Sequence, residues 1–136
     1  MEKEFTILIA DRNHHVRELL KREMMAEGYI IRVAKNGQEV LKWVYDQEPL
    51  DLVILDLDLP DFEETQVLDK INDRVPYLPV VIHTFVSEYN NNPAIKTAAG
   101  LVEKDGSSIS RLKEMVSSLL GGPIQRKQKD NGRISS

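Results

Sequence analysis

The 136-residue sequence predicts an α/β fold, a five-stranded parallel sheet doubly wound by helices as a (βα)5 sandwich. Two observations carry this prediction. Short, almost wholly apolar runs alternate with longer segments in which apolar side chains recur at helical spacing. Five such strand-then-helix units fit into about 120 residues, and right-handed crossovers between parallel strands place helices on both faces of the sheet.

Five apolar runs define the expected strands. Their composition is typical of strands that are covered on both faces. The third run is the most apolar, so we expect it at the centre of the sheet. Pro79 lies near the entry of the fourth run, where a missing N–H group is tolerated. The runs span residues 5–10, 29–34, 52–55, 78–83 and 101–103.

Helical spacing predicts the segments between the strands. The first helix begins after Asn13, which has the side chain of an N-cap, and ends at Gly28, a C-terminal cap. The second follows the turn at residues 36–37, and Ser107 or Ser108 caps the last helix. The apolar positions are Val16, Leu19, Leu20 and Met24; Val40, Leu41 and Val44; Val67, Leu68 and Ile71; and Ile109, Leu112, Met115, Val116, Leu119 and Leu120.

Two segments fit this alternation poorly. Residues 87–99 should form the fourth helix, but the stretch 90–93 is poor helix material and apolar positions are sparse. Residues 121–136 open on Gly-Gly-Pro, which ends a helix, and hold too little apolar surface to fold alone. We therefore divide the chain into a folded domain at residues 1–120 and a basic C-terminal tail at residues 121–136. We expect the tail to be disordered, with a basic docking arm as the alternative.

Composition narrows the class of function. The absence of cysteine excludes disulfides, thiolate metal sites and cysteine nucleophiles. The net charge of −4 divides into −7 for the domain and +3 for the tail, and an acidic domain argues against direct binding of nucleic acid. Because no apolar run approaches the length of a membrane span and the N-terminus is not a signal peptide, we expect a cytoplasmic protein with no membrane partner.

Polar side chains follow the predicted strands at one edge of the sheet. Asp11 follows the first strand, Asp56 the third, Thr84 the fourth and Lys104 the fifth, while Asp58 lies two residues beyond Asp56. In sheets of this kind, function lies outside the carboxyl ends of the strands. Carboxylate oxygens suit Mg²⁺, and an ammonium and a hydroxyl group can hold phosphoryl oxygens. The set predicts phosphoryl transfer to a carboxylate.

Four sequence motifs then point to a known family. The motifs ILIAD, DLVILDLDLPD, PVVIHT and VEKD occur in this order and at matching spacing. Over about residues 5–120 the chain resembles the receiver domain of two-component response regulators, which has a flavodoxin-like fold. A flavodoxin-like cofactor binder fits the same topology, but the residues after the first strand are not the Gly-rich or Ser/Thr-rich phosphate loop that it needs.

The resemblance implies a role for each residue at the strand ends. Asp56 would accept a phosphoryl group from the phosphohistidine of a partner histidine kinase or phosphotransfer protein. Asp11, Asp56 and the backbone carbonyl of Asp58 would hold Mg²⁺. Lys104 would contact the phosphoryl group, and Thr84 would move toward it and report the modified state. The domain would then be a signalling switch, catalysing at most its own phosphorylation from a phosphodonor and slow autodephosphorylation, with a downstream protein as target.

One departure from the family bears directly on the metal. The family's first strand ends in two adjacent acids, whereas this chain has Asp11 and Arg12. We expect a weakened Mg²⁺ site, with Arg12 either pointing away or pairing with Asp56 in place of part of the metal's charge. In the second case the chain would be a pseudo-receiver, a protein-interaction module that works without phosphorylation.

Other departures and candidates are less specific. Phe85 stands where the family prefers a small residue and would cover the site or turn outward as a contact. Leu101 replaces the aromatic residue of the family's switch. The sequence PDFEET replaces a Gly-containing turn, and its acids are candidates to recruit a cation through their side chains. We interpret His14 and His15 as surface residues at a helix start, because they and His83 lack companions at ligand spacing. Trp43 is expected to pack partly against the domain.

Overall fold

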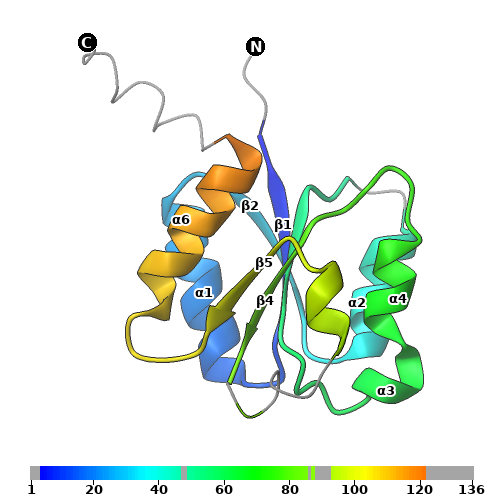
Figure 1. The fold of residues 1–136 in the computed structure, drawn as a ribbon. Coiled ribbons are helices and arrows are strands. Elements are labelled where there is room, and N and C mark those ends of the chain that lie inside the picture. Colours follow the sequence, from blue (N-terminus) through cyan, green and yellow to red (C-terminus); the bar gives the residue numbers. More distant parts are fainter. Residues whose placement is uncertain (1–3, 47–48, 86, 88–92, 122–136) are drawn as a thin grey trace.

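A computed structural model describes residues 4–46, 49–85, 87 and 93–121. It contains a five-stranded sheet in the order β2-β1-β3-β4-β5, and every neighbouring pair of strands is parallel (Figure 1). The predicted fold class is confirmed, with the third strand at the centre of the sheet. The strands are β1 (Thr6–Ala10), β2 (Ile30–Ala34), β3 (Leu52–Leu55), β4 (Val80–Thr84) and β5 (Gly100–Glu103).

Helices cover both faces of the sheet. In Figure 1, α1 and α6 lie on one side and α2, α3 and α4 on the other, while the carboxyl ends of the strands point to the bottom of the view. The helices are α1 (His14–Ala26), α2 (Gly37–Tyr45), α3 (Phe62–Thr65), α4 (Val67–Asn72) and α6 (Ser108–Leu120), with a short 3₁₀ helix η1 (Pro93–Thr97). No helix in the described part of the chain is both long and apolar enough to cross a membrane.

Side chains at the helix ends match most of the predicted caps. The Asn13 side chain accepts a hydrogen bond from the backbone N–H of Val16, and Asn36 caps α2 in the same way. Gly28 follows the end of α1 with φ of 101°, a conformation that glycine adopts at little cost. Ser107 is the N-cap of α6, but its side chain makes no capping hydrogen bond.

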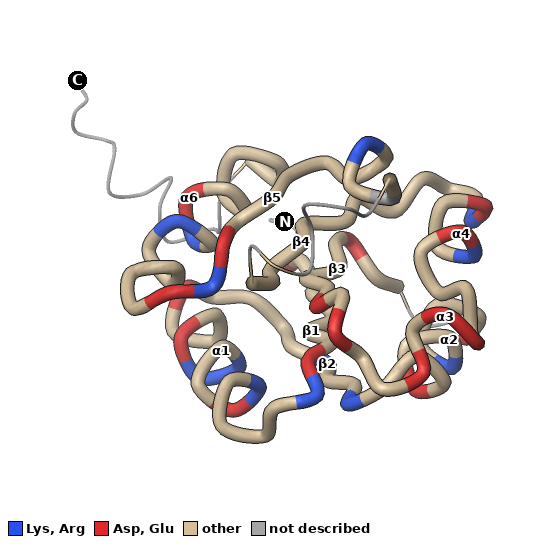
Figure 2. Tube along the Cα trace, turned by 60° about the horizontal axis from the view of Figure 1, so that its bottom comes forward, with Lys and Arg blue, Asp and Glu red and all other residues tan. Residues whose placement is uncertain are grey.

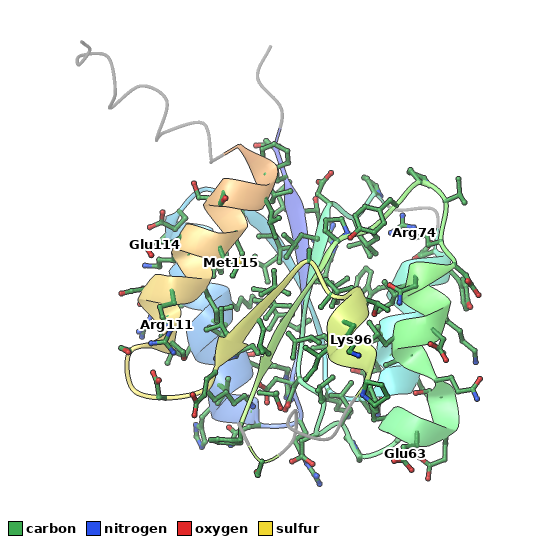
Figure 3. All side chains as sticks on the ribbon, in the orientation of Figure 1. Glu63, Arg74, Lys96, Arg111, Glu114 and Met115 are labelled. Carbon is green, nitrogen blue, oxygen red and sulfur yellow. The ribbon has the colours of Figure 1, made fainter. Side chains whose placement is uncertain are left out.

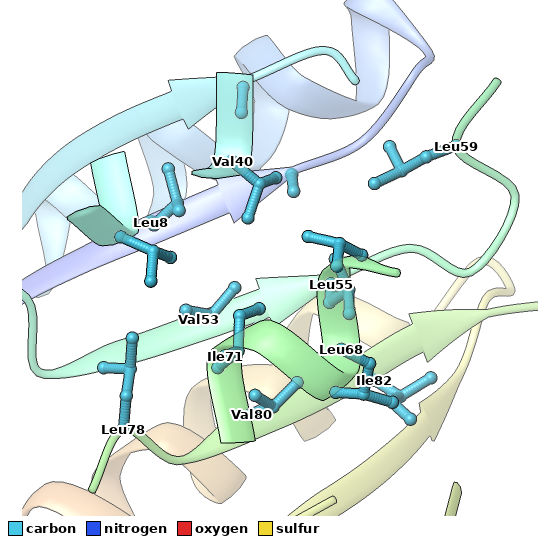
Figure 4. Packing of buried hydrophobic residues seen from close by; sticks show 14 of the residues in the cluster. Leu8, Val40, Val53, Leu55, Leu59, Leu68, Ile71, Leu78, Val80 and Ile82 are labelled. Atoms are coloured by element: carbon cyan, nitrogen blue, oxygen red, sulfur yellow. The ribbon is translucent and has the colours of Figure 1, made fainter. Parts of the chain in front are cut away.

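The hydrophobic core has two halves because side chains of a strand alternate between the faces of the sheet. One half joins the sheet to α2 and α4, as Figure 4 shows for Leu8, Val53, Val80, Leu68 and Ile71. The other joins it to α1 and α6 through residues that include Ile7, Ile54, Val81, Leu112 and Val116. Each of these fully buried side chains contributes roughly 1.5–3 kcal/mol by leaving water.

The predicted fourth helix lies partly outside the described residues. Within residues 87–99, the structure describes residue 87 as helical and η1 at Pro93–Thr97, and residues 88–92 are not described. The predicted third helix, with Val67, Leu68 and Ile71, is observed as α4, and a short additional helix, α3, precedes it. Gln66 separates the two helices with left-handed backbone angles of φ 50° and ψ 44°. The tail beyond residue 121 lies outside the described residues, so its disorder stays a prediction.

Candidate functional site

The carboxyl ends of the strands bring the predicted site residues together. Figure 2 turns this edge of the sheet toward the reader, and acidic segments gather beside the labels of β1 and β3. The backbone N–H of Asp56 donates to Ala10 O at 3.0 Å, and the N–H of Lys104 donates to Thr84 O at 2.8 Å. These ladder contacts continue just past the strand ends and fix the backbones from which the site side chains extend.

Four of the predicted residues form a buried group, here called the inner cluster: Asp11, Asp56, Thr84 and Lys104. The ammonium group of Lys104 lies 2.8 Å from Asp11 Oδ2 and 3.1 Å from Asp56 Oδ2. The hydroxyl group of Thr84 donates to Asp56 Oδ1 at 3.0 Å. The two carboxylate side chains are only 1–2% exposed and Lys104 is 9% exposed, so water weakens these interactions little.

Electrostatics within the inner cluster follow from two carboxylates sharing one ammonium group. Burial raises the pKa of Asp11, against the opposing effect of its hydrogen bond with Lys104. Burial also lowers the pKa of Lys104, but the hydrogen bond to Asp11 and the charge of Asp56 together raise it above its ordinary value. With both acids ionised the cluster carries a net charge of −1, which favours a further cation.

The chain around Asp11 holds that residue in place from two sides. Asp11 Oδ1 accepts a hydrogen bond from the backbone N–H of Asn13 at 2.9 Å. The guanidinium group of Arg17, on the first turns of α1, donates to the backbone carbonyl of Asp11 at 2.8 Å. Asp11 is therefore both part of the turn into α1 and a member of the inner cluster. The contact of Arg17 with Asp11 was not predicted from the sequence pattern.

Arg12 points away from Asp56 and toward Asp58, and these two residues are here called the outer pair. Its Nη1 atom lies 3.6 Å from Asp58 Oδ2 and 3.5 Å from the backbone carbonyl of Asp58. Both side chains are about half exposed, at 51% and 47%. The predicted alternative in which Arg12 pairs with Asp56 is wrong, because Arg12 pairs with Asp58 and the cation beside Asp56 is Lys104.

Asp58 also contacts the inner cluster through its backbone, because its N–H donates to Asp56 Oδ1 at 3.0 Å. The side chains of Asp11 and Asp56 and the carbonyl of Asp58 supply hard oxygen ligands of the kind that Mg²⁺ takes together with waters. No group of three or more His, Cys, Asp or Glu side chains suitable for a metal occurs among the described residues. The oxygens near one another at this edge come from two carboxylate side chains and one carbonyl, with Lys104 and Arg12 as neighbouring positive charges.

The other predicted departures also have defined places. The ring of Phe85 is 55% exposed and its centroid lies 5.3 Å from Lys104 Nζ, so the ring covers the outer side of the ammonium group. Leu101 is half-buried against the core on the α2 and α4 side. The carboxylate of Asp61 accepts hydrogen bonds from the backbone N–H groups of Gly37 and Gln38, so this acid caps α2. Of the acids in this turn, Glu63 and Glu64 are exposed.

His14, His15 and Trp43 lie where the sequence analysis predicted, whereas His83 is a buried histidine to which the sequence analysis gave no role. His14 and His15 are exposed at the start of α1. Trp43 is half-buried and donates from Nε1 to Val33 O at 3.0 Å. His83, in contrast, is 3% exposed and lies 3.0 Å from Ser108 Oγ. The one sequence signal for His83 was a titratable residue inside a run of buried apolar side chains.

Comparison with known proteins identifies the family. A family model described as the response regulator receiver domain matches residues 7–117. The chain is 38% identical over 76 residues to Response regulator RR06 of Streptococcus pneumoniae and 29% identical over 82 residues to the DNA-binding transcriptional regulator NtrC of Proteus hauseri. These alignments cover 56% and 60% of this chain but only 34% and 17% of those proteins. The chain belongs to the response regulator receiver domain family.

Solved structures agree with this assignment. The response regulator TrrA of Thermotoga maritima, in complex with Mg²⁺ and BeF, is similar with a TM-score of 0.76 and 34% sequence identity. The match covers 85% of this chain and 99% of that one. TrrA in complex with the histidine kinase ThkA matches with a TM-score of 0.75 at the same identity, over 85% of this chain and 98% of that chain. The chain thus carries the fold of two-component receiver domains.

Proposed function

We propose that this domain is a phosphorylation-dependent switch in which Asp56 accepts a phosphoryl group from a partner histidine kinase or phosphotransfer protein. The observation that carries the proposal is the inner cluster, in which one carboxylate is held by a lysine, a threonine and a backbone N–H. Membership of the receiver family supports it, as does the similarity to TrrA, which is found in complex with a histidine kinase. We place its action in the cytoplasm, with a downstream protein as target.

The chemistry follows from the contacts of Asp56. An oxygen of the ionised carboxylate attacks phosphorus, and the P–N bond to the donor imidazole breaks as the new P–O bond forms. Bound Mg²⁺, held by Asp11, Asp56 and the carbonyl of Asp58, would neutralise charge on the phosphoryl oxygens. The protein contributes position and charge rather than a general base.

The resting contacts must rearrange once Asp56 is modified. Both carboxylate oxygens already have partners, Lys104 at Oδ2 and Thr84 with the backbone of Asp58 at Oδ1. A phosphoryl group adds negative charge and acceptor oxygens beyond the carboxylate. Lys104 and Thr84 then turn from the carboxylate to the phosphoryl oxygens, and this movement reports the modification to the surface near β4 and β5.

Labelling with a small phosphodonor tests this function. We expect incubation of the chain with acetyl phosphate and millimolar Mg²⁺ to add one phosphoryl group, seen by mass spectrometry and mapped to Asp56. Asp56→Asn should abolish the label, and Asp58→Asn, which keeps the backbone carbonyl, should retain it. A wild-type chain that gains no mass, or a label that persists in Asp56→Asn, would refute the role of Asp56.

We propose in addition that the metal site is weaker than one with a second acid at position 12. Arg12 places a guanidinium group 3.5 Å from the carbonyl that would ligate Mg²⁺, so a divalent cation must approach against a like charge. We expect Arg12→Asp to tighten Mg²⁺ binding by about tenfold, which corresponds to about 1.4 kcal/mol. Titration followed by the fluorescence of Trp43 or by backbone amide shifts measures both affinities, with Arg12→Gln as the neutral intermediate.

The same titration separates the switch from a pseudo-receiver. A switch binds Mg²⁺ and fluoroberyllate together, and the amides of β4 and β5 then shift. If wild-type protein binds neither while Arg12→Asp binds both, the domain works without phosphorylation. Labelling that proceeds unchanged in the presence of a chelator would instead remove Mg²⁺ from the mechanism.

A further inference from the structure

His83 is a buried polar residue that the proposed chemistry does not use. It lies on β4 beside Thr84, on the face of the sheet that packs against α1 and α6, and only 3% of it is exposed. Its register partner on β5 is Val102, whose neighbours on that face are apolar. An imidazole in such surroundings requires hydrogen-bond partners to offset the loss of water.

One ring nitrogen of His83 has a partner and the other has none in the described part of the chain. The Nε2 atom lies 3.0 Å from Ser108 Oγ. The hydroxyl hydrogen of Ser108 is donated to the backbone carbonyl of Asp105 at 3.1 Å. With its hydrogen directed to Asp105 O, Ser108 Oγ is free to accept from Nε2–H, and His83 Nδ1 is then a buried acceptor without a partner in the described residues. An unpaired buried acceptor lowers the stability of a fold, so an apolar residue at position 83 would give a more stable protein than histidine. A histidine at this position is therefore best explained by a role for its contact with Ser108.

The hydrogen bond between His83 and Ser108 lies at the turn that connects β5 to α6 and that includes Lys104. The backbone of Lys104 is fixed to β4 by its bond to Thr84 O, and the next residue, Asp105, is the one whose carbonyl receives the Ser108 hydroxyl. On the outer side of the same turn, Arg111 donates to Glu103 O at 2.8 Å and to Asp105 Oδ2 at 2.9 Å. Figure 3 shows Arg111 on α6 beside this turn.

The two sides of the turn differ in how much solvent they meet. The side chains of Arg111 and Asp105 are 42% and 45% exposed, so water competes for their contacts. The hydrogen bonds that join His83 to Ser108 and Ser108 to Asp105 lie on the less exposed side of the turn, where water competes less and each hydrogen bond is stronger. The inner contact is therefore the one that restricts where the backbone after Lys104 can move.

We propose that His83 is a positioning residue that, through Ser108, holds the turn after β5 and thereby keeps the Lys104 ammonium group against Asp56. The inference rests on the proposed function, in which Lys104 neutralises charge at the phosphoryl-acceptor carboxylate. His83 touches no reacting atom. Its effect reaches the site only through the backbone of residues 104–108.

The test compares variants that differ in this one hydrogen bond. His83→Gln retains an N–H donor near the position of Nε2, whereas His83→Leu and Ser108→Ala remove the contact. Val81→Ala is the matched control, because Val81 lies on the same face of β4, is fully buried, and packs in the core without a polar contact. Its truncation lowers stability without touching the turn. All variants are compared at a temperature where each is more than nine-tenths folded.

Two measurements are made on the full chain. The first is the ¹⁵N-detected NMR signal of the Lys104 ammonium group, which is sharp only when hydrogen bonds slow its rotation and exchange. The second is the rate of phosphorylation at saturating Mg²⁺ and saturating acetyl phosphate. We expect His83→Leu and Ser108→Ala to shift or broaden the ammonium signal and to lower the saturated rate about tenfold. His83→Gln should remain within twofold of wild type, as should Val81→Ala.

Each result decides the inference. An ammonium signal that is unchanged in His83→Leu and Ser108→Ala overturns it, as does a loss in Val81→Ala equal to that in His83→Leu. Failure of the wild-type chain to accept a phosphoryl group overturns the proposed function alone, because the ammonium signal still reports whether His83 positions Lys104. A double variant, His83→Leu with Ser108→Ala, should show no loss beyond that of either single variant.

Discussion

The inner cluster and the outer pair lie side by side yet differ in almost every physical respect. Lys104 meets Asp11 and Asp56 at 2.8 and 3.1 Å among side chains that are 1–9% exposed. Arg12 meets Asp58 at 3.6 Å, with both side chains about half exposed. Removing or adding a charge lowers the free energy of unfolding strongly in the buried inner cluster and only slightly in the exposed outer pair. The chain departs from the family pattern at the exposed position, Arg12, and retains each polar group of the buried cluster.

Removing Lys104 from the inner cluster and Arg12 from the outer pair gives the largest expected difference in the free energy of unfolding. Lys104→Met leaves two buried carboxylates side by side without a positive charge, and we expect the free energy of unfolding to fall by about 3–5 kcal/mol. Arg12→Met removes a solvent-screened partner, and we expect a change within about 0.5 kcal/mol. Urea unfolding at pH 7 with a chelator present measures both. Equal losses in the two variants would contradict the contrast.

His83, which is buried next to Thr84 of the inner cluster, should also make the free energy of unfolding depend on pH. Burial first, and then the charge of Lys104, lower the pKa of His83 to about 4, while Asp56 and Asp105 act in the opposite direction and Arg111 adds to the lowering. Between pH 6.5 and pH 4 the unfolded chain therefore binds a proton that the folded chain does not. Stability is lost as the pH falls through this window, by about 3 kcal/mol in all.

A matched variant isolates this contribution. His83→Gln keeps a hydrogen-bond donor but cannot titrate, so its stability should fall less than that of wild type between pH 7 and pH 4. Asp11, whose pKa burial raises, titrates in both proteins and is removed by taking the difference. The measurement is urea unfolding at intervals of half a pH unit. Parallel curves for the two proteins would show that His83 does not carry the dependence.

Much of the fold and site could be predicted because each depends on local sequence. Apolar runs specify strands such as Leu52–Leu55, and the carboxyl ends of parallel strands meet at one edge. Asp11, Asp56, Thr84 and Lys104 therefore had to converge once the strands were placed. The direct neighbours of Asp56 follow from strand order alone.

What escaped prediction depends on contacts between segments distant in the chain. Arg12 had two possible partners in sequence, and only the positions of Lys104 and Asp58 in space decide between them. The role of Asp61 as a cap of α2 joins residues 24 apart, and His83 meets Ser108 across 25 residues. Such pairs leave no periodic signal, because a single side-chain contact across the fold imposes no pattern on its neighbours.

The segment that follows the outer pair is expected to tolerate a stabilising change. Gln66 separates α3 from α4 with φ of 50° and ψ of 44°, a left-handed conformation that costs a residue with a Cβ atom about 1–2 kcal/mol. Gln66→Gly removes that strain but makes the unfolded chain more flexible. We expect a net gain of about 0.5–1 kcal/mol in urea unfolding. Gln66→Ala, which keeps the Cβ atom, is the control and should match wild type within about 0.5 kcal/mol; an equal gain in both variants would remove backbone strain as the cause.

The smallest expected effect lies where the inner cluster meets solvent. The ring of Phe85 lies 5.3 Å from Lys104 Nζ and is 55% exposed, so its attraction to the ammonium group should stabilise the fold by about 0.5 kcal/mol. Phe85→Leu keeps apolar bulk and removes this attraction. In a double-mutant cycle with Lys104→Met, the loss caused by Phe85→Leu should vanish when Lys104 is absent. A loss that persists at full size in the Lys104→Met background would mean that Phe85 contributes by apolar packing, and the inner cluster would then end at Lys104.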